Sequence, residues 1–161
     1  MNPSGSFKPV LVSACLVGIN CRYDGKNCLS KNLLNFLKDR IFIPLCPEQL
    51  GGLPTPRPRA YFASGDGHSA LLNKSKIFSL GKKEVTENFI KGANEGLKVA
   101  RYYPFTLAVL KEGSPSCGVN YTYRKRDKIN GCGVFTALLK KEMSGLKIVS
   151  ELEIKRYDKI V

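Results

Sequence analysis

VLVSACLVG, residues 10–18, begins with an apolar and β-branched run, Val10 to Ala14, that stops at Cys15. A run of this length and composition predicts a short buried strand followed by a loop. Three later runs of similar character predict further strands at residues 41–45, 105–110 and 147–149. The chain therefore carries four short apolar segments that suit the interior of a sheet.

Helices are predicted between these strands. Ser30 is placed to cap a helix whose apolar face consists of Leu33, Leu34, Phe36 and Leu37. Helical spacing of apolar residues predicts two more helices, at residues 84–101 and 131–142. Alternating strands and helices favour an α/β fold: a single-domain, three-layer structure with a mostly parallel sheet. In such a fold the functional site lies beyond the carboxyl ends of the strands.

The chain has 161 residues, of which 43% are hydrophobic, and this amount suits one hydrophobic core. We therefore expect one domain over residues 1–161, with a flexible N-terminus at residues 1–8. Residues 46–73 are dense in proline and glycine, and we interpret them as a long ordered loop that carries function. A domain linker would have a similar composition.

The chain is strongly basic. Lysine and arginine number 26 and aspartate and glutamate 13, giving a formal charge of +13. This excess favours anionic partners such as nucleotides or RNA, although scattered charges also suit a merely solvated surface. The start lacks the apolar core of a signal peptide, and no stretch approaches the roughly 20 apolar residues of a membrane helix. We expect a cytoplasmic protein with no membrane partner and no obligatory protein partner.

Six cysteines need an explanation, because a cytoplasmic compartment keeps thiols reduced and structural disulfides there are rare. The chain contains no CxxC pair, which argues against a zinc ribbon and a thioredoxin-type motif. Metal binding, catalysis or simple burial remain. Any metal ligands must come together from distant loops.

Three of the cysteines share a position relative to the predicted strands. Cys15 and Cys46 directly follow the first two strands, and Cys117 lies just beyond the third. In a parallel sheet all three would face one crevice, where three thiolates would bind a metal and leave one position open. The alternative is that they are small buried hydrophobes. The remaining cysteines, Cys21, Cys28 and Cys132, lack this pattern and are expected to be structural.

Polar residues near these cysteines are candidates for chemistry. Glu48 follows Cys46 by two residues and is a candidate general acid or base, or else the partner of a nearby arginine. Ser114 could orient a polar substrate or donate a hydrogen bond to it, or serve only as a turn residue. The candidate substrate-binding residues are Ser13, Arg22, Asp24, Arg57 and Ser116. Arg59 could also hold an anion, whereas the single histidine, His68, has no carboxylate at a diagnostic spacing.

Five motifs resemble the thiouracil desulfidase family, in the same order and over nearly the whole chain. They are VSACLVGINCRYDG, CPEQLGGLPTPRP, KGANEGLKVA, AVLKEGSPSCG and GCGVFTALL. The resemblance implies a 4Fe-4S cluster bound by Cys15, Cys46 and Cys117, with one iron left open. That iron would act as a Lewis acid on the sulfur of a thiolated pyrimidine. Glu48 would shuttle the proton while water attacks, and Ser114 would assist.

The implied reaction is a non-redox desulfuration that converts thiouracil to uracil and hydrogen sulfide. The chain departs from the family pattern at Arg59-Ala60-Tyr61 and at Asn120 to Asp127, where cationic residues are added. These cations suit a thiolated nucleotide or thiolated RNA rather than a free base.

Two other functions remain open at this stage. One is a sulfur carrier or transferase that uses the same cluster. The other is a basic nucleic-acid-binding module whose cysteines are structural or bind zinc. Tyrosines at Tyr102-Tyr103 and Tyr121-Thr-Tyr123, followed by Arg124-Lys125-Arg126, could stack on and hold bases. No recognised RNA-binding signature or phosphate-binding glycine loop accompanies them.

Overall fold

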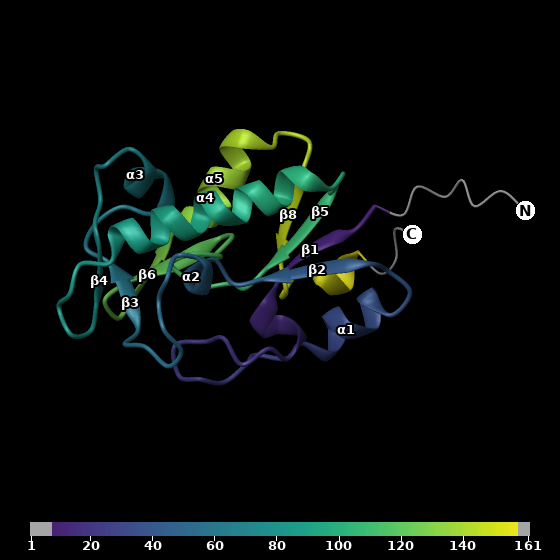
Figure 1. Ribbon diagram of the computed structural model, residues 1–161, viewed down its shortest axis with the longest axis horizontal. Coiled ribbons are helices and arrows are strands. Elements are labelled where there is room, and N and C mark those ends of the chain that lie inside the picture. The colour runs from purple at the N-terminus through teal and green to yellow at the C-terminus, as the bar shows by residue number, and fades with distance from the viewer. Residues whose placement is uncertain (1–7, 158–161) are drawn as a thin grey trace, which may run out of the picture.

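The computed structural model describes residues 8–157 and has a four-stranded parallel sheet at its centre (Figure 1). The strands lie in the order β2-β1-β5-β8. Their bounds are Val10–Ser13 for β1, Phe42–Leu45 for β2, Leu107–Leu110 for β5 and Lys147–Ser150 for β8. The four predicted strands are confirmed, each within two residues of its expected limits.

The N-terminal segment predicted to be flexible, residues 1–8, lies outside the described residues except for Lys8. The single domain over residues 1–161 stays a prediction. Among residues 8–157, no helix is both long and apolar enough to span a membrane.

The order of the strands creates a switch point beside β1. Strand β2 pairs with one edge of β1, and β5 pairs with the other, both in parallel. The chain therefore leaves β1 toward one side of the sheet and later crosses back to the other side. A crevice opens where the direction of winding reverses, beyond the carboxyl ends of the strands, and this is where ligands bind in folds of this kind.

Helices cover both faces of the sheet. Leu11 and Leu110 pack on one face, in a core cluster with Phe89 and Phe135 of α4 (Thr86–Tyr102) and α5 (Val134–Glu142). Val12, the residue after Leu11 in β1, belongs to a second core cluster on the other face of the sheet. This cluster includes residues of α1 (Lys31–Leu37) and η2 (Ile154–Arg156). Figure 1 shows α4 and α5 above the sheet and α1 below it. The predicted three-layer α/β fold is confirmed.

The prediction for α1 is correct except for one residue. The Ser30 hydroxyl accepts a hydrogen bond from the Leu33 amide at 3.2 Å, as an N-cap residue does. Leu33, Phe36 and Leu37 are buried, but Leu34 is 37% exposed. Because Leu34 lies one position after Leu33, it turns about 100° away from the buried stripe.

The interpretation of residues 46–73 as one long loop is wrong in part. This segment contains α2 (Pro47–Leu50), β3 (Ala60–Phe62) and α3 (Gly67–Leu71). Strand β3 pairs with β4 (Ile77–Ser79) in an antiparallel hairpin. Short elements of this kind are set by local signals, such as proline at the first helical position of α2. They carry too few residues to show periodicity.

Two other loops also form regular structure. The polar segment after Cys117 folds into a hairpin of β6 (Tyr121–Arg124) and β7 (Asp127–Asn130), with Lys125 at the turn at a φ of +55°. The loop expected after β1 begins as a short 3-10 helix, η1 (Ala14–Val17). Gly18 ends η1 at a φ of +96°, a conformation that glycine adopts without strain.

Candidate functional site

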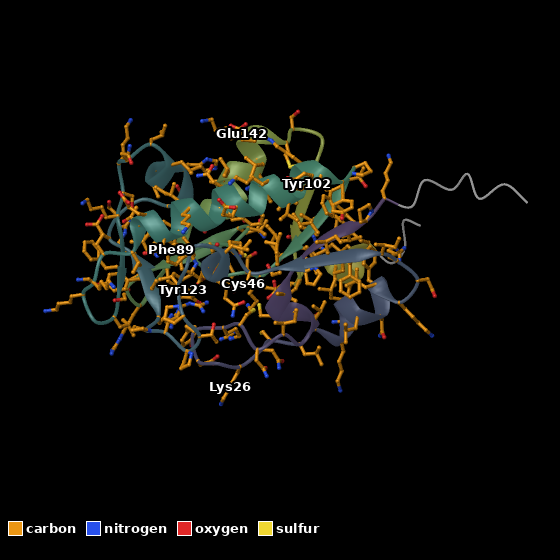
Figure 2. The ribbon with its side chains drawn as sticks, viewed as in Figure 1. Lys26, Cys46, Phe89, Tyr102, Tyr123 and Glu142 are labelled. Atoms are coloured by element: carbon orange, nitrogen blue, oxygen red, sulfur yellow. The ribbon has the colours of Figure 1, made fainter. Side chains whose placement is uncertain are left out.

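A cavity of about 320 Å³ opens beyond the carboxyl ends of β1, β2 and β5. Cys15, Cys46 and Cys117 all line it, one from the segment that follows each strand, and a fourth thiol, Cys21, lines it as well. All four cysteines are free. In Figure 2, Cys46 lies near the middle of the view, and Tyr123, which lines the same cavity, lies to its left. The strand-end pattern thus correctly predicted which segments meet.

Helix α2 sets the position of Cys46. Cys46 is the extended N-cap residue of α2, and Pro47 is its first helical residue. The helix lies directly on α4, because a Cβ atom added at Gly92 would be 1.8 Å from the Pro47 carbonyl oxygen. The Asn88 side chain of α4 also donates to the Gly51 carbonyl at 2.9 Å. This close backbone contact with α4 therefore fixes the position of α2 and of Cys46 at its N-terminus.

The loop that carries Cys117 is closed by its own serine. The Ser114 hydroxyl oxygen accepts from the backbone amides of Ser116 and Cys117, both at 3.1 Å. The Gly118 amide donates to the Ser114 carbonyl at 2.8 Å. Behind the loop, a Cβ atom added at Gly133 would lie 2.2 Å from the Ser116 carbonyl oxygen. The turn before α5 thus supports the loop from behind.

Glu112 anchors both ends of this loop and is 3% exposed. Its Oε1 accepts from the amides of Val119 at 2.8 Å, Asn120 at 2.9 Å and Tyr121 at 3.2 Å. Its Oε2 accepts from the Asn120 side chain at 2.8 Å. Burial acts to raise the pKa of Glu112, but these N–H donors outweigh it, so the pKa lies below its usual value.

Glu48 is held between an arginine and a serine. Arg57 donates to Glu48 Oε2 through Nε at 2.8 Å and pairs with it through Nη2 at 2.6 Å. A third donor of Arg57, Nη1, binds the Cys21 carbonyl at 3.0 Å. The Ser114 hydroxyl donates to Glu48 Oε1 at 3.5 Å. Arg57 lines the cavity, and its side chain, paired with Glu48, is only 5% exposed. Substrate binding by Arg57 stays a prediction.

Cys21 is a cavity residue that the sequence pattern did not place in the site. The Cys46 thiol donates to the Cys21 carbonyl at 3.8 Å. The neighbouring Cys15 thiol, and then burial, raise the pKa of Cys21 to about 11 against the lowering effect of Cys46. The loop after η1 turns back on itself, since the Cys28 amide donates to the Cys15 carbonyl at 2.9 Å. The Asp24-Gly25 turn was the available signal. It indicated a returning loop but not where the loop would place Cys21.

Two predicted serines lie in the cavity wall. Ser13 ends β1, and its hydroxyl accepts from the Lys111 amide at 2.9 Å. Ser116 is 1% exposed, and its hydroxyl has no hydrogen-bond partner within the part of the chain that the structure describes. A buried hydroxyl of this kind is costly unless a ligand supplies the missing partner.

The predicted charged residues divide between the cavity wall and its surroundings. Arg22 and Arg59 line the cavity, and Arg59 lies over the Tyr123 ring, 5.0 Å from its centre. Within residues 8–157, Arg59 forms no ion pair. Asp24 does not line the cavity but pairs with Arg22 at 3.6 Å. Asp24 therefore lies beside the cavity, next to Arg22, and its predicted contact with substrate stays a prediction.

The donor set suits a polynuclear cluster better than a single zinc ion. Around one zinc, with bonds of about 2.3 Å, thiolate sulfurs lie about 3.8 Å apart. Among residues 8–157, the sulfurs of Cys15, Cys46 and Cys117 do not all lie within 4.8 Å of one another. Hydrogen bonding to Cys21, and then burial, raises the pKa of Cys46, and burial raises that of Cys117. A bound metal would ionise both thiols.

A family model described as 2-thiouracil desulfurase matches residues 10–151. The chain belongs to the 2-thiouracil desulfurase family. The Uncharacterized protein YbbK of Bacillus subtilis (strain 168) is 38% identical to this chain over 148 residues, which cover 90% of this chain and 97% of YbbK.

A solved structure of the 4Fe-4S-dependent thiouracil desulfidase TudS matches with a TM-score of 0.77 and 33% identity. The match covers 96% of this chain and 99% of TudS. The predicted membership of the 2-thiouracil desulfurase family and the predicted fold are both confirmed. The roles of individual site residues stay predictions.

Proposed function

We propose that this protein is a desulfidase that hydrolyses the C=S bond of a thiolated pyrimidine base or nucleotide. Water supplies the oxygen of the new carbonyl group, and the sulfur leaves as hydrogen sulfide, so the reaction has no net oxidation or reduction. The observation that carries the proposal is the meeting of three strand-end cysteines with Glu48 and Ser114 around one cavity. The family and the TudS match support it.

Cys15, Cys46 and Cys117 would hold a 4Fe-4S cluster. Three thiolates bind three of its four irons, and the cluster, when bound, supplies a Lewis acid to the substrate sulfur at the fourth. All three residues are free thiols in one cavity wall, and the unpartnered Ser116 hydroxyl lies among them.

Glu48 is the group that moves protons in this proposal. Its Oε2 is occupied by Arg57, which leaves Oε1 directed toward Ser114 and the cavity. The Ser114 hydroxyl already accepts two backbone hydrogen bonds, so its own proton is free to point at Glu48. Glu48 can therefore take a proton from the attacking water, and the Ser114 hydroxyl can relay it.

The mouth of the cavity suits an aromatic and anionic substrate. Tyr121 and Tyr123 line it and offer ring faces and edges to a pyrimidine. Arg59, held over the Tyr123 ring, and Arg22 supply positive charge at the same wall. We therefore propose a thiolated nucleotide as the preferred substrate over the free base. A thiolated RNA is a larger version of the same anionic substrate.

The test begins with anaerobic purification followed by iron and sulfide analysis. About four irons and four sulfides per chain are expected, and Cys46→Ala should lose them. The loaded protein should then release sulfide from a thiolated uracil or its nucleotide without a sulfur acceptor. A requirement for an acceptor would instead establish a sulfur carrier. Iron-free protein that resists reconstitution would overturn the cluster.

A further inference from the structure

A second set of metal-binding side chains lies outside the cavity. The ligand atoms of Asp66, His68 and Cys132 all lie within 4.8 Å of one another. None of the three lines the cavity of the proposed desulfidase site. Cys132 is 2% exposed, whereas His68 is exposed to solvent. The set therefore joins a buried sulfur to a nitrogen that can be reached from outside.

The surrounding contacts hold the sulfur and the carboxylate near each other. Asp66 caps α3: its Oδ1 accepts from the His68 amide at 3.1 Å and the Ser69 amide at 3.3 Å. Its Oδ2 accepts from the Cys132 amide at 3.1 Å and lies 4.0 Å from the Cys132 sulfur. These bonds leave Oδ2 with acceptor capacity facing the thiol. The His68 ring is exposed and can therefore change its orientation to complete the ligand set.

A hollow of about 330 Å³ adjoins the same three side chains. It leaves room for a water as the fourth ligand. From the thiolate, imidazole and carboxylate donors, and from this hollow, we propose that Asp66, His68 and Cys132 bind one Zn²⁺ ion. The thiolate and carboxylate together carry two negative charges, which match the ion. Burial raises the pKa of the Cys132 thiol to about 11, against the lowering effect of Lys140, which also lines the hollow. Zinc would therefore displace the thiol proton as it binds.

The position of this site links it to the loop of Cys117. Cys132 stands in the turn Gly131 to Gly133, and the Gly133 amide donates to the Gly118 carbonyl at 2.9 Å. A zinc ion on Cys132 would tie this turn to the start of α3. It would thereby stiffen the support behind the loop that carries Cys117, without entering the cavity.

The test is a zinc titration of the full chain, with thermal unfolding and bound zinc per chain as readouts. Binding to the native state raises the Tm. His68→Ala should keep the zinc-free Tm, because His68 is exposed, and should lower zinc affinity at least about tenfold. Cys132→Ser should also lower zinc affinity at least about tenfold. Cys28 lies outside both sites, so Cys28→Ser should bind zinc as the unmodified chain does.

Two results would overturn the proposal. One is the absence of a zinc-dependent Tm shift in the unmodified chain. The other is equal zinc affinity in the His68→Ala variant and the unmodified chain, which would assign the zinc to the cavity thiols. If Cys132→Ser does not fold, the zinc affinity of His68→Ala still tests the proposal. Cys46→Ala separates this inference from the proposed function, because it should lose iron and keep the zinc response.

Discussion

Replacing Glu112 by glutamine tests how the Cys117 loop is held. Four N–H groups within 3.2 Å converge on the Glu112 carboxylate, from Val119, Tyr121 and both nitrogens of Asn120. Glutamine keeps the shape and one oxygen but loses the charge. Its amide nitrogen would also face the Asn120 side-chain nitrogen, where a donor meets a donor.

The expected loss in the free energy of unfolding follows from the strengths of these hydrogen bonds. A bond to a charged acceptor contributes about 1.5–3 kcal/mol and one between neutral groups about 0.5–1.5 kcal/mol. Weakening several bonds, offset in part by the easier burial of a neutral group, gives a loss of about 3 kcal/mol in the free energy of unfolding. For a chain of this size that corresponds to a fall in Tm of about 6–12 °C.

The difference in stability between Glu112→Gln and the unmodified chain should depend on pH. The N–H donors hold the pKa of Glu112 in the folded protein below its unfolded value. Its stabilising contribution is therefore fully present above the unfolded pKa of 4.5 and is lost as pH falls through the folded pKa. The stability difference between Glu112→Gln and the unmodified chain should be largest near neutral pH and shrink in acid.

Urea unfolding at neutral and acidic pH measures both effects. The matched control is Glu142→Gln, which removes an exposed ion pair with Arg101 on the upper side of the molecule in Figure 2. Because exposed pairs contribute about 1 kcal/mol or less, this control should change little. If Glu112→Gln were as stable as the control at neutral pH, the anchoring role of Glu112 would be refuted.

Four further predictions concern the cavity. Glu48→Gln should lower kcat about 10²–10⁴-fold with iron per chain unchanged, and a loss of iron would show a structural role instead. Arg57→Lys should lower kcat about 10–100-fold, because one ammonium cannot hold both Glu48 and the Cys21 carbonyl; unchanged kcat would contradict this. Iron analysis should find that Cys21→Ser keeps most of its iron while Cys117→Ser does not. Arg59→Ala should raise KM about tenfold for a thiolated nucleotide and leave KM for the free base unchanged, and equal effects on both would refute nucleotide preference.

The sequence predicted the segments that form the site because strand ends are visible in hydrophobic patterns. Cys15, Cys46 and Cys117 each follow an apolar run, and a parallel sheet brings such positions together. Cys21 was missed because it reaches the cavity through a loop whose path depends on tertiary hydrogen bonds. Glu112 was missed because its partners are backbone amides, which no side-chain pattern records.

The short helices and strands between residues 46 and 79 could not be predicted from the sequence either. Strands β3 and β4 have three residues each, too few for alternation to stand out from a proline-rich background. The pairing of Glu48 with a nearby arginine was one of two predictions for Glu48, and the fold identifies that arginine as Arg57. Sequence shows a cation near Glu48, but only the fold shows that the cation is buried against it.

The contact between α2 and α4 depends on Gly92, a small residue far along the chain from the proposed reactive groups. Gly92 permits α2 to approach, and α2 carries both Glu48 and the cysteine that precedes it. Any side chain at position 92 would push both groups outward together. A library screened for loss of sulfide release should therefore return substitutions at Gly92 alongside those at the cysteines. From the sequence alone, the substitutions at Gly92 would look like changes in an ordinary surface helix.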